Sequence, residues 1–126
     1  MNNKISILIA DDQPDIRKLV RITLECEPSY EVIEAADGAA AWMQLCCHKP
    51  DLVVLDVMMP TIDGLQLCRM IRSSPELEHT YVIMISARAQ RADIEQGIKA
   101  GCNRYLCKPF STLDLLHAVD QLVEED

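Results

Sequence analysis

Residues 51–64 read DLVVLDVMMPTIDG, and this stretch opens with an unbroken apolar run from Leu52 to Leu55. Such a run is typical of a strand that is covered on both faces of a sheet. A carboxylate, Asp56, then follows where the surrounding residues are still apolar. Burying a charged group is costly unless a partner compensates it. The stretch therefore predicts a buried strand that delivers an acid to a site.

Strand and helix patterns alternate on both sides of this stretch. Strands are expected at residues 5–10, 31–35, 52–57, 81–86 and 105–107. A helical pattern follows each strand. The first has Pro14 in its first turn, the second runs from about residue 37 to Pro50, and the third and fourth cover about 64–72 and 91–100. The last begins after Ser111 or Thr112 as N-cap. This alternation predicts right-handed βαβ units and one doubly wound α/β domain over residues 1–126, with an ordered core of about 4–124. The short second and fifth strands are expected at the edges of a parallel sheet.

The fourth helical pattern is the weakest. It offers only Ala92, Ile94 and Ile98 to a core and contains Gly97. Glycine costs a helix about 1 kcal/mol relative to alanine. The helix is either simply marginal or one that must move.

Composition limits the classes of function. The chain has 126 residues, 49% of them apolar, which is enough to close one core without disulfide or metal. The net charge of −8, with no basic block, disfavours direct binding to nucleic acid or to an anionic membrane. No signal peptide and no apolar stretch of roughly 18 residues is seen, so we expect a soluble, cytoplasmic chain. The cysteines, without zinc-type spacing, are expected to be small buried hydrophobes in a reducing cytoplasm. They are Cys26, Cys46, Cys47, Cys68, Cys102 and Cys107.

Polar residues stand at the ends of four expected strands. They are Asp11, Asp12, Asp56, Ser86 and Lys108. Each has an ordinary explanation by itself: a helix-entry turn or loop for the acids, a turn hydroxyl, and a solvated lysine. Turn chemistry does not require all of them together, however, and parallel strands place their carboxyl ends at one edge of the sheet. The combination therefore predicts a joint site.

The chemistry of this set points to phosphate. Two carboxylates about 4 Å apart repel each other by about 4 kcal/mol at an effective dielectric constant of about 20, so three of them need a cation. Oxygen ligands suit a hard divalent ion such as Mg²⁺. The lysine and the hydroxyl would hold phosphoryl oxygens, and Asp56 would act as a nucleophile that becomes an aspartyl phosphate.

These residues, in this order, resemble the receiver domain of response regulators, the phosphoacceptor module of two-component signalling. The resemblance is carried by ILIADDQPDIR, LVVLDVMMPTIDG, MISA and AGCNRYLCKPF, and it covers nearly the whole chain. It implies a flavodoxin-like fold with strand order 2-1-3-4-5. It also implies that Asp56 accepts a phosphoryl group from a phosphohistidine on a histidine kinase or phosphotransfer protein. Asp12 and Asp56 would bind Mg²⁺ directly, Asp11 largely through water, and the backbone carbonyl of Met58 would be a further ligand.

The resemblance implies a switch as well. Lys108 would pair with Asp56 or its phosphate, beside a cis bond between Lys108 and Pro109. Ser86 would bind the phosphate, and Tyr105 would turn inward with it. The fourth helix, fifth strand and last helix would then be the moving surface, on which an output domain, a downstream protein or a second phosphorylated copy could dock.

The chain departs from typical relatives at a few positions. Asn103–Arg104 stands where many relatives have an acidic pair, Cys107 replaces a frequent threonine, and Ser86 keeps only the hydroxyl of the commoner threonine. Because Arg104 is basic, the partners of typical relatives are a poor guide to the partners of this chain. Met58 and Arg88 are expected to flank the site and to control the access of water.

Two other functions are compatible with a sheet of this kind. A small phosphatase with an aspartyl nucleophile would carry a second aspartate two residues later, where this chain has Met58. A flavin or nucleotide carrier would need a Gly/Ser/Thr-rich loop after the first strand, where this chain has two acids. We therefore favour a signalling domain that assists its own phosphorylation and dephosphorylation without turning over an external substrate. The chain could be complete or the amino-terminal receiver of a longer regulator.

Overall fold

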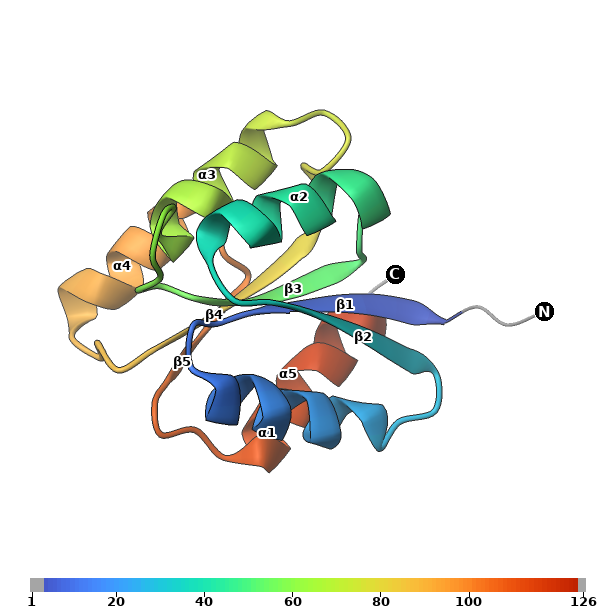
Figure 1. Ribbon diagram of the computed structural model, residues 1–126. Coiled ribbons are helices and arrows are strands. Elements are labelled where there is room, and N and C mark those ends of the chain that lie inside the picture. The colour runs from blue at the N-terminus through green and yellow to red at the C-terminus, as the bar shows by residue number, and fades with distance from the viewer. Residues whose placement is uncertain (1–3, 125–126) are drawn as a thin grey trace.

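A parallel sheet of five strands runs through the middle of the molecule, with helices on both faces (Figure 1). The computed structural model describes residues 4–124, so residues 1–3 and 125–126 of the expected domain lie outside the described residues. The strands are β1 Ile5–Ala10, β2 Tyr30–Ala35, β3 Leu52–Asp56, β4 Tyr81–Ser86 and β5 Arg104–Cys107. They lie in the order β2-β1-β3-β4-β5, which confirms the expected topology and the edge positions of β2 and β5.

The helices divide between the two faces of the sheet. They are α1 Pro14–Glu25, α2 Gly38–His48, α3 Gly64–Ser73, α4 Arg91–Ala100 and α5 Thr112–Glu124. Figure 1 shows α2, α3 and α4 over one face, and α1 and α5 over the other. Successive strand residues fill the two cores in turn: Leu55 packs on the side of α2 and α3, and Val54 on the side of α1 and α5. Because both faces are covered, the central strands are continuously apolar, as their sequence indicated.

Residues that favour a helix start stand soon after the ends of the strands. Pro14 occupies the first turn of α1, where its missing N–H costs nothing. The side chains of Asp37 and Asp63 accept backbone N–H groups from Ala40 and Gln66, both at 2.8 Å. Ser111, one of the two expected caps of α5, accepts the N–H of Asp114 at 3.3 Å. The loops are therefore short at the edge of the sheet where the polar residues gather.

The packing of α4 differs from the expectation. Ile98 is 61% exposed and Ala92 is also exposed, whereas Gly97 and Ala100 are buried. A Cβ added at Gly97 would lie 2.8 Å from Cδ2 of Tyr105, which is closer than real contacts allow. The helix thus approaches the fifth strand through its small residues, and the glycine makes room for an aromatic ring.

The expectation that all the cysteines are buried was wrong for half of them. Cys68 is buried, and its burial raises the pKa of its thiol to about 11. Cys102 and Cys107 are half-buried, but Cys26, Cys46 and Cys47 are exposed; all six are free thiols. The exposed cysteines lie at the C-terminal ends of α1 and α2. An apolar neighbour in the sequence does not make a cysteine there face the core. Within residues 4–124, no helix has the length and apolar character needed to cross a membrane.

Candidate functional site

Three carboxylates meet beyond the carboxyl ends of β1 and β3. One oxygen from each of Asp11, Asp12 and Asp56 lies within 4.8 Å of the others. Asp11 is fully buried and Asp56 is 5% exposed, whereas Asp12 faces solvent. Oδ1 of Asp11 accepts the N–H of Gln13 at 2.9 Å, and Oδ1 of Asp56 accepts the N–H of Met58 at 3.2 Å. The loops after the two strands therefore fix the orientation of both buried acids.

Lys108 brings its ammonium group into the middle of these acids from the end of β5. Nζ lies 3.2 Å from Oδ2 of Asp56, to which it donates a hydrogen bond, and 3.1 Å from Oδ2 of Asp11. The contact with Asp11 is one of charge only, because the two groups are oriented so that no hydrogen bond forms. Oδ2 of Asp11 consequently has no hydrogen-bond donor within the described part of the chain, although it is buried. The peptide bond between Lys108 and Pro109 is cis, as the resemblance implied.

The environment of Asp56 disfavours its charged form. Burial raises the pKa of its carboxyl group, the neighbouring Asp11 carboxylate raises it further, and the Lys108 ammonium lowers it in part. A single ammonium group thus faces two buried acids and a third exposed one. Positive charge added among these acids would relieve their mutual repulsion.

The donor set fits a hard divalent cation. It consists of carboxylate oxygens from three residues, and the buried Oδ2 of Asp11, although 3.1 Å from the Lys108 ammonium group, accepts no hydrogen bond from residues 4–124. Mg²⁺ binds through oxygen ligands and usually keeps several waters, which the exposed side of Asp12 would admit. The side chains of Asp11, Asp12 and Asp56 lie close enough together to hold such an ion, whereas a ligand role for the backbone carbonyl of Met58 stays a prediction.

Ser86 and Tyr105 are connected through one short segment after β4. Ser86 is 1% exposed, and its Oγ accepts the backbone N–H of Arg88 at 3.0 Å. The hydroxyl of Tyr105 donates to the backbone carbonyl of the same residue at 2.7 Å. The ring of Tyr105 is half-buried against Gly97. A change at Ser86 can therefore reach β5 and α4 through the backbone of Arg88.

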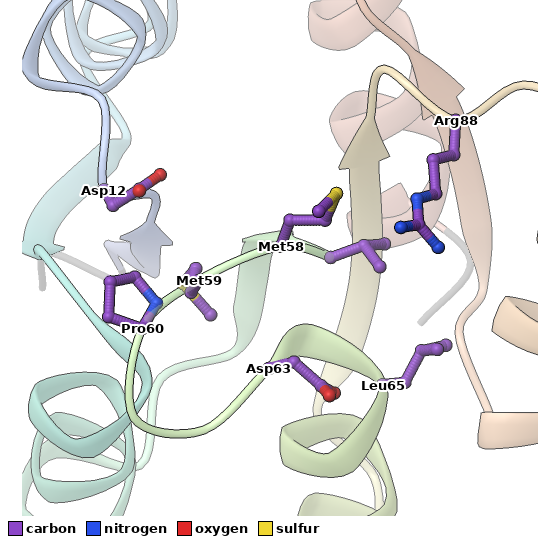
Figure 2. Close-up of a pocket in the computed structure, with 8 residues that line it drawn as sticks. Asp12, Met58, Met59, Pro60, Asp63, Leu65 and Arg88 are labelled. Atoms are coloured by element: carbon purple, nitrogen blue, oxygen red, sulfur yellow. The ribbon is translucent and has the colours of Figure 1, made fainter.

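A hollow opens over the acids at this edge of the sheet, and a larger one lies beside it. The smaller, of about 330 Å³, lies over Asp56 itself and is lined by Asp12, Gln13, Asp56, Met58, Ser86, Ala87 and Lys108. The larger, of about 510 Å³, lies beside it and is lined by Asp12, Val57, Met58, Met59, Pro60, Asp63, Leu65 and Arg88. Figure 2 shows Asp12 and Arg88 on opposite sides of the larger hollow, with Met58 between them. Met58 and Arg88 thus flank the acids, where the sequence placed them.

The family model of the response regulator receiver domain matches residues 7–120 of the chain. The chain belongs to this family. Response regulator Rre1 of Synechocystis sp. is 36% identical over 123 residues, which cover 98% of this receiver domain and 53% of Rre1. The transcriptional regulatory protein ResD of Bacillus subtilis is 39% identical over 121 residues, which cover 96% of this chain and 49% of ResD. This receiver domain thus spans about half the length of the curated relatives it matches.

Solved structures agree with this assignment. The Francisella response regulator 1452 receiver domain superimposes with a TM-score of 0.88 at 30% identity, covering 97% of this chain and 98% of that one. The chemotaxis response regulator CheY4 of Vibrio cholerae gives a TM-score of 0.87 at 28% identity, with 94% and 98% covered. The chain is a receiver domain of two-component signalling, and its relatives are response regulators, which does not support the phosphatase or carrier alternatives.

One polar residue of the receiver site was not singled out by the sequence. Gln13 lines the hollow over Asp56, and its side-chain oxygen accepts a hydrogen bond from Nζ of Lys108 at 2.7 Å. Its only signal in the sequence is its place directly after the two acids. Gln13 and Lys108 stand 95 positions apart, so the contact appears only once the fold is known.

Proposed function

We propose that Asp56 accepts a phosphoryl group from a phosphohistidine on a histidine kinase or a histidine phosphotransfer protein, in a reaction that requires Mg²⁺. The observation that carries this proposal is the position of Asp56, which lies almost buried beneath a hollow, with two further acids and an ammonium group around it. A buried acid so placed has no structural need for two acidic neighbours. Its surroundings suit a nucleophile that receives an anionic group.

Phosphoryl transfer would exchange one bond to phosphorus for another. An oxygen of Asp56 would bond to phosphorus as the phosphorus–nitrogen bond of the partner's phosphohistidine breaks, and the leaving imidazole would keep the electron pair and take a proton from solvent. The Lys108 ammonium and the Ser86 hydroxyl would donate to the phosphoryl oxygens. Mg²⁺, held by Asp11, Asp12, Asp56 and the carbonyl of Met58, would supply charge neutralisation. Attack by water on the aspartyl phosphate would later restore Asp56, so the domain assists both steps without an external substrate.

The phosphorylated state would differ from the resting state at the segment after β4. A phosphoryl group brings about two negative charges and strong acceptor oxygens. Ser86 would turn its hydroxyl towards them, which would disturb its hydrogen bond with the backbone of Arg88. The hydrogen bond from the Tyr105 hydroxyl to the carbonyl of Arg88 would change in consequence. Contacts that favour the second arrangement by about 5.5 kcal/mol would change a 1:99 population into 99:1. The altered surface would be that of α4, β5 and α5, to which an output domain, a downstream protein or a second phosphorylated copy would bind.

Intact mass spectrometry after incubation with a small phosphodonor tests this function. We expect one added phosphoryl group that requires Mg²⁺, is suppressed by a chelator and is absent in Asp56→Asn. Asp63→Asn is the matched control, because Asp63 lines the larger of the two hollows but is exposed and caps α3. A phosphoryl group that persists in Asp56→Asn, or that disappears in Asp63→Asn alone, would contradict the assignment.

A further inference from the structure

The shortest contact of the Lys108 ammonium group is to a neutral side chain. Nζ donates to Oε1 of Gln13 at 2.7 Å, whereas the nearest oxygens of Asp11 and Asp56 lie at 3.1 and 3.2 Å. An ammonium group has three N–H donors, and the amide oxygen of Gln13 takes one of them. Lys108 is only partly exposed, so this partner helps to determine where its charge sits.

The backbone of Gln13 is fixed by the same elements that fix the acids. Its N–H donates to Oδ1 of Asp11 at 2.9 Å, and its carbonyl accepts the N–H of Arg17 at 3.1 Å, at the start of α1. Gln13 stands at the N-cap of this helix, yet its side chain makes no capping hydrogen bond. The side chain extends instead across the hollow to the end of β5. The side chain of Gln13 thus binds the Lys108 ammonium group and does not cap α1.

The neutrality of the amide distinguishes it from the other two partners of the lysine. Asp11 and Asp56 are also the carboxylates that would hold Mg²⁺, so a bound cation would compete with the ammonium group for their oxygens. An amide oxygen is a weaker ligand for the cation than these carboxylates, because it carries no net charge. Gln13 therefore remains available to Lys108 when both acids are engaged.

We propose that Gln13 is a positioning residue for phosphoryl transfer: its amide oxygen holds the Lys108 ammonium group beside Asp56, so that the other N–H groups point to the incoming phosphoryl oxygens. This inference rests on the proposed function of Asp56. It assigns to the residue after the acid pair a role that acts through the lysine, without contact between Gln13 and the reacting atoms.

The test compares variants that differ in the acceptor at position 13. Gln13→Met keeps the length of the side chain but removes the acceptor, and Gln13→Glu keeps an acceptor oxygen. Because a hydrogen bond to a charged group is among the stronger ones, we expect Gln13→Met to slow phosphorylation by a small phosphodonor about tenfold. Gln13→Glu should lose less than Gln13→Met, because its oxygen still accepts from Lys108, although its added charge also attracts the cation. Gln121→Met, at an exposed position of α5, is the control and should phosphorylate at the wild-type rate.

Binding measurements separate positioning from a loss of structure. Beryllofluoride, a phosphoryl mimic, should bind Gln13→Met about tenfold more weakly. The Mg²⁺ affinity measured by calorimetry and the urea unfolding midpoint should stay at their wild-type values, because Gln13 is neither a ligand nor part of the core. Wild-type rates in Gln13→Met, equal losses in Gln13→Met and Gln13→Glu, or a matching loss of Mg²⁺ affinity would each overturn the inference while leaving phosphorylation of Asp56 intact. A wild-type chain that takes up no phosphoryl group would overturn the proposed function as well.

Discussion

Asp56 is held in a state that the folded chain does not favour. Burial and the neighbouring Asp11 raise the pKa of its carboxyl group, and Lys108 opposes them only in part. An unperturbed aspartate has a pKa of about 3.9. Since the pKa is raised on folding, the contribution of Asp56 to stability is present below the unfolded pKa and is lost as the pH rises through the folded value. At neutral pH the ionised group therefore lowers the free energy of unfolding.

Replacing this acid should stabilise the protein. In a chelating buffer at pH 7, we expect a larger free energy of unfolding for Asp56→Asn than for the wild type. The difference should shrink as the pH falls through the raised pKa of the folded wild type, and it should stop changing below the unfolded pKa of about 3.9. Urea unfolding followed by circular dichroism at several pH values measures it. Asp63→Asn, which replaces one good helix cap by another, should show no such gain. A variant at position 56 that is less stable than the wild type at pH 7 would refute the argument.

Much of the site could be predicted at the level of single residues. Asp56 and Ser86 end their strands and Asp11 directly follows β1. Because parallel strands place their carboxyl ends together, the proximity of these residues follows from the sequence. The hydrogen bond between Gln13 and Lys108 could not be predicted in this way, since it depends on the direction of two long side chains from different loops. Backbone topology determines which residues gather, and side-chain packing determines which of them touch.

At the level of the element, α4 shows where propensity and packing disagree. The sequence pattern predicts that Gly97 weakens the helix and that Ile98 belongs to its core face. In the structure, Gly97 is buried against the ring of Tyr105 and Ile98 is exposed. Propensity describes an isolated helix, and it contains no information about an aromatic side chain that arrives from the neighbouring strand.

Gly97→Ala separates these two effects. Helix propensity alone would stabilise the variant by about 1 kcal/mol. The added Cβ would, however, lie 2.8 Å from Cδ2 of Tyr105 and 3.2 Å from Sδ of Met84, and overpacking costs roughly 1–3 kcal/mol. We therefore expect a net loss in the wild-type background and a smaller loss, or a gain, in Tyr105→Ala. Urea unfolding of the four proteins gives the coupling. Equal effects in both backgrounds would show that the ring does not matter.

At the level of the whole molecule, α4 is attached at both of its ends to different parts of the chain. At its C-terminal end, Nε of Arg72 donates to the carbonyl of Gly101 at 2.9 Å, and a terminal nitrogen of the same guanidinium donates to the carbonyl of Thr80 at 2.6 Å. At its N-terminal end, α4 follows the segment that Ser86 and Tyr105 share. The guanidinium lies at the end of the sheet opposite the acids. A signal from Asp56 should therefore move the N-terminal end of α4 more than its C-terminal end.

Amide hydrogen exchange measures this asymmetry. On addition of beryllofluoride and Mg²⁺, we expect exchange in the first half of α4 to change about tenfold or more, which corresponds to about 1.4 kcal/mol of local opening free energy. Amides next to Gly101 should change least. Asp56→Asn under the same conditions is the control and should show no change. Identical protection of α4 with and without the mimic would exclude this helix from the response.

The order of the strands illustrates a further limit of the sequence. The apolar runs predict a parallel sheet, and their lengths predict its edge strands, but they do not specify which strands are neighbours. The order 2-1-3-4-5 was implied by the family resemblance. The exposure of Cys26, Cys46 and Cys47 was missed because composition places cysteine in cores, while the angular position on a helix decides the individual case.

The uneven exposure of the cysteines makes the chain suitable for selective chemical labelling. Thiol-reactive reagents attack the thiolate of accessible groups, so Cys68, buried and with a pKa of about 11, should stay unmodified. Cys46 and Cys47 lie exposed in the last turn of α2, at the end of that helix remote from the acids. A fluorescent dye attached there would leave the phosphoryl chemistry undisturbed at the opposite end of the sheet.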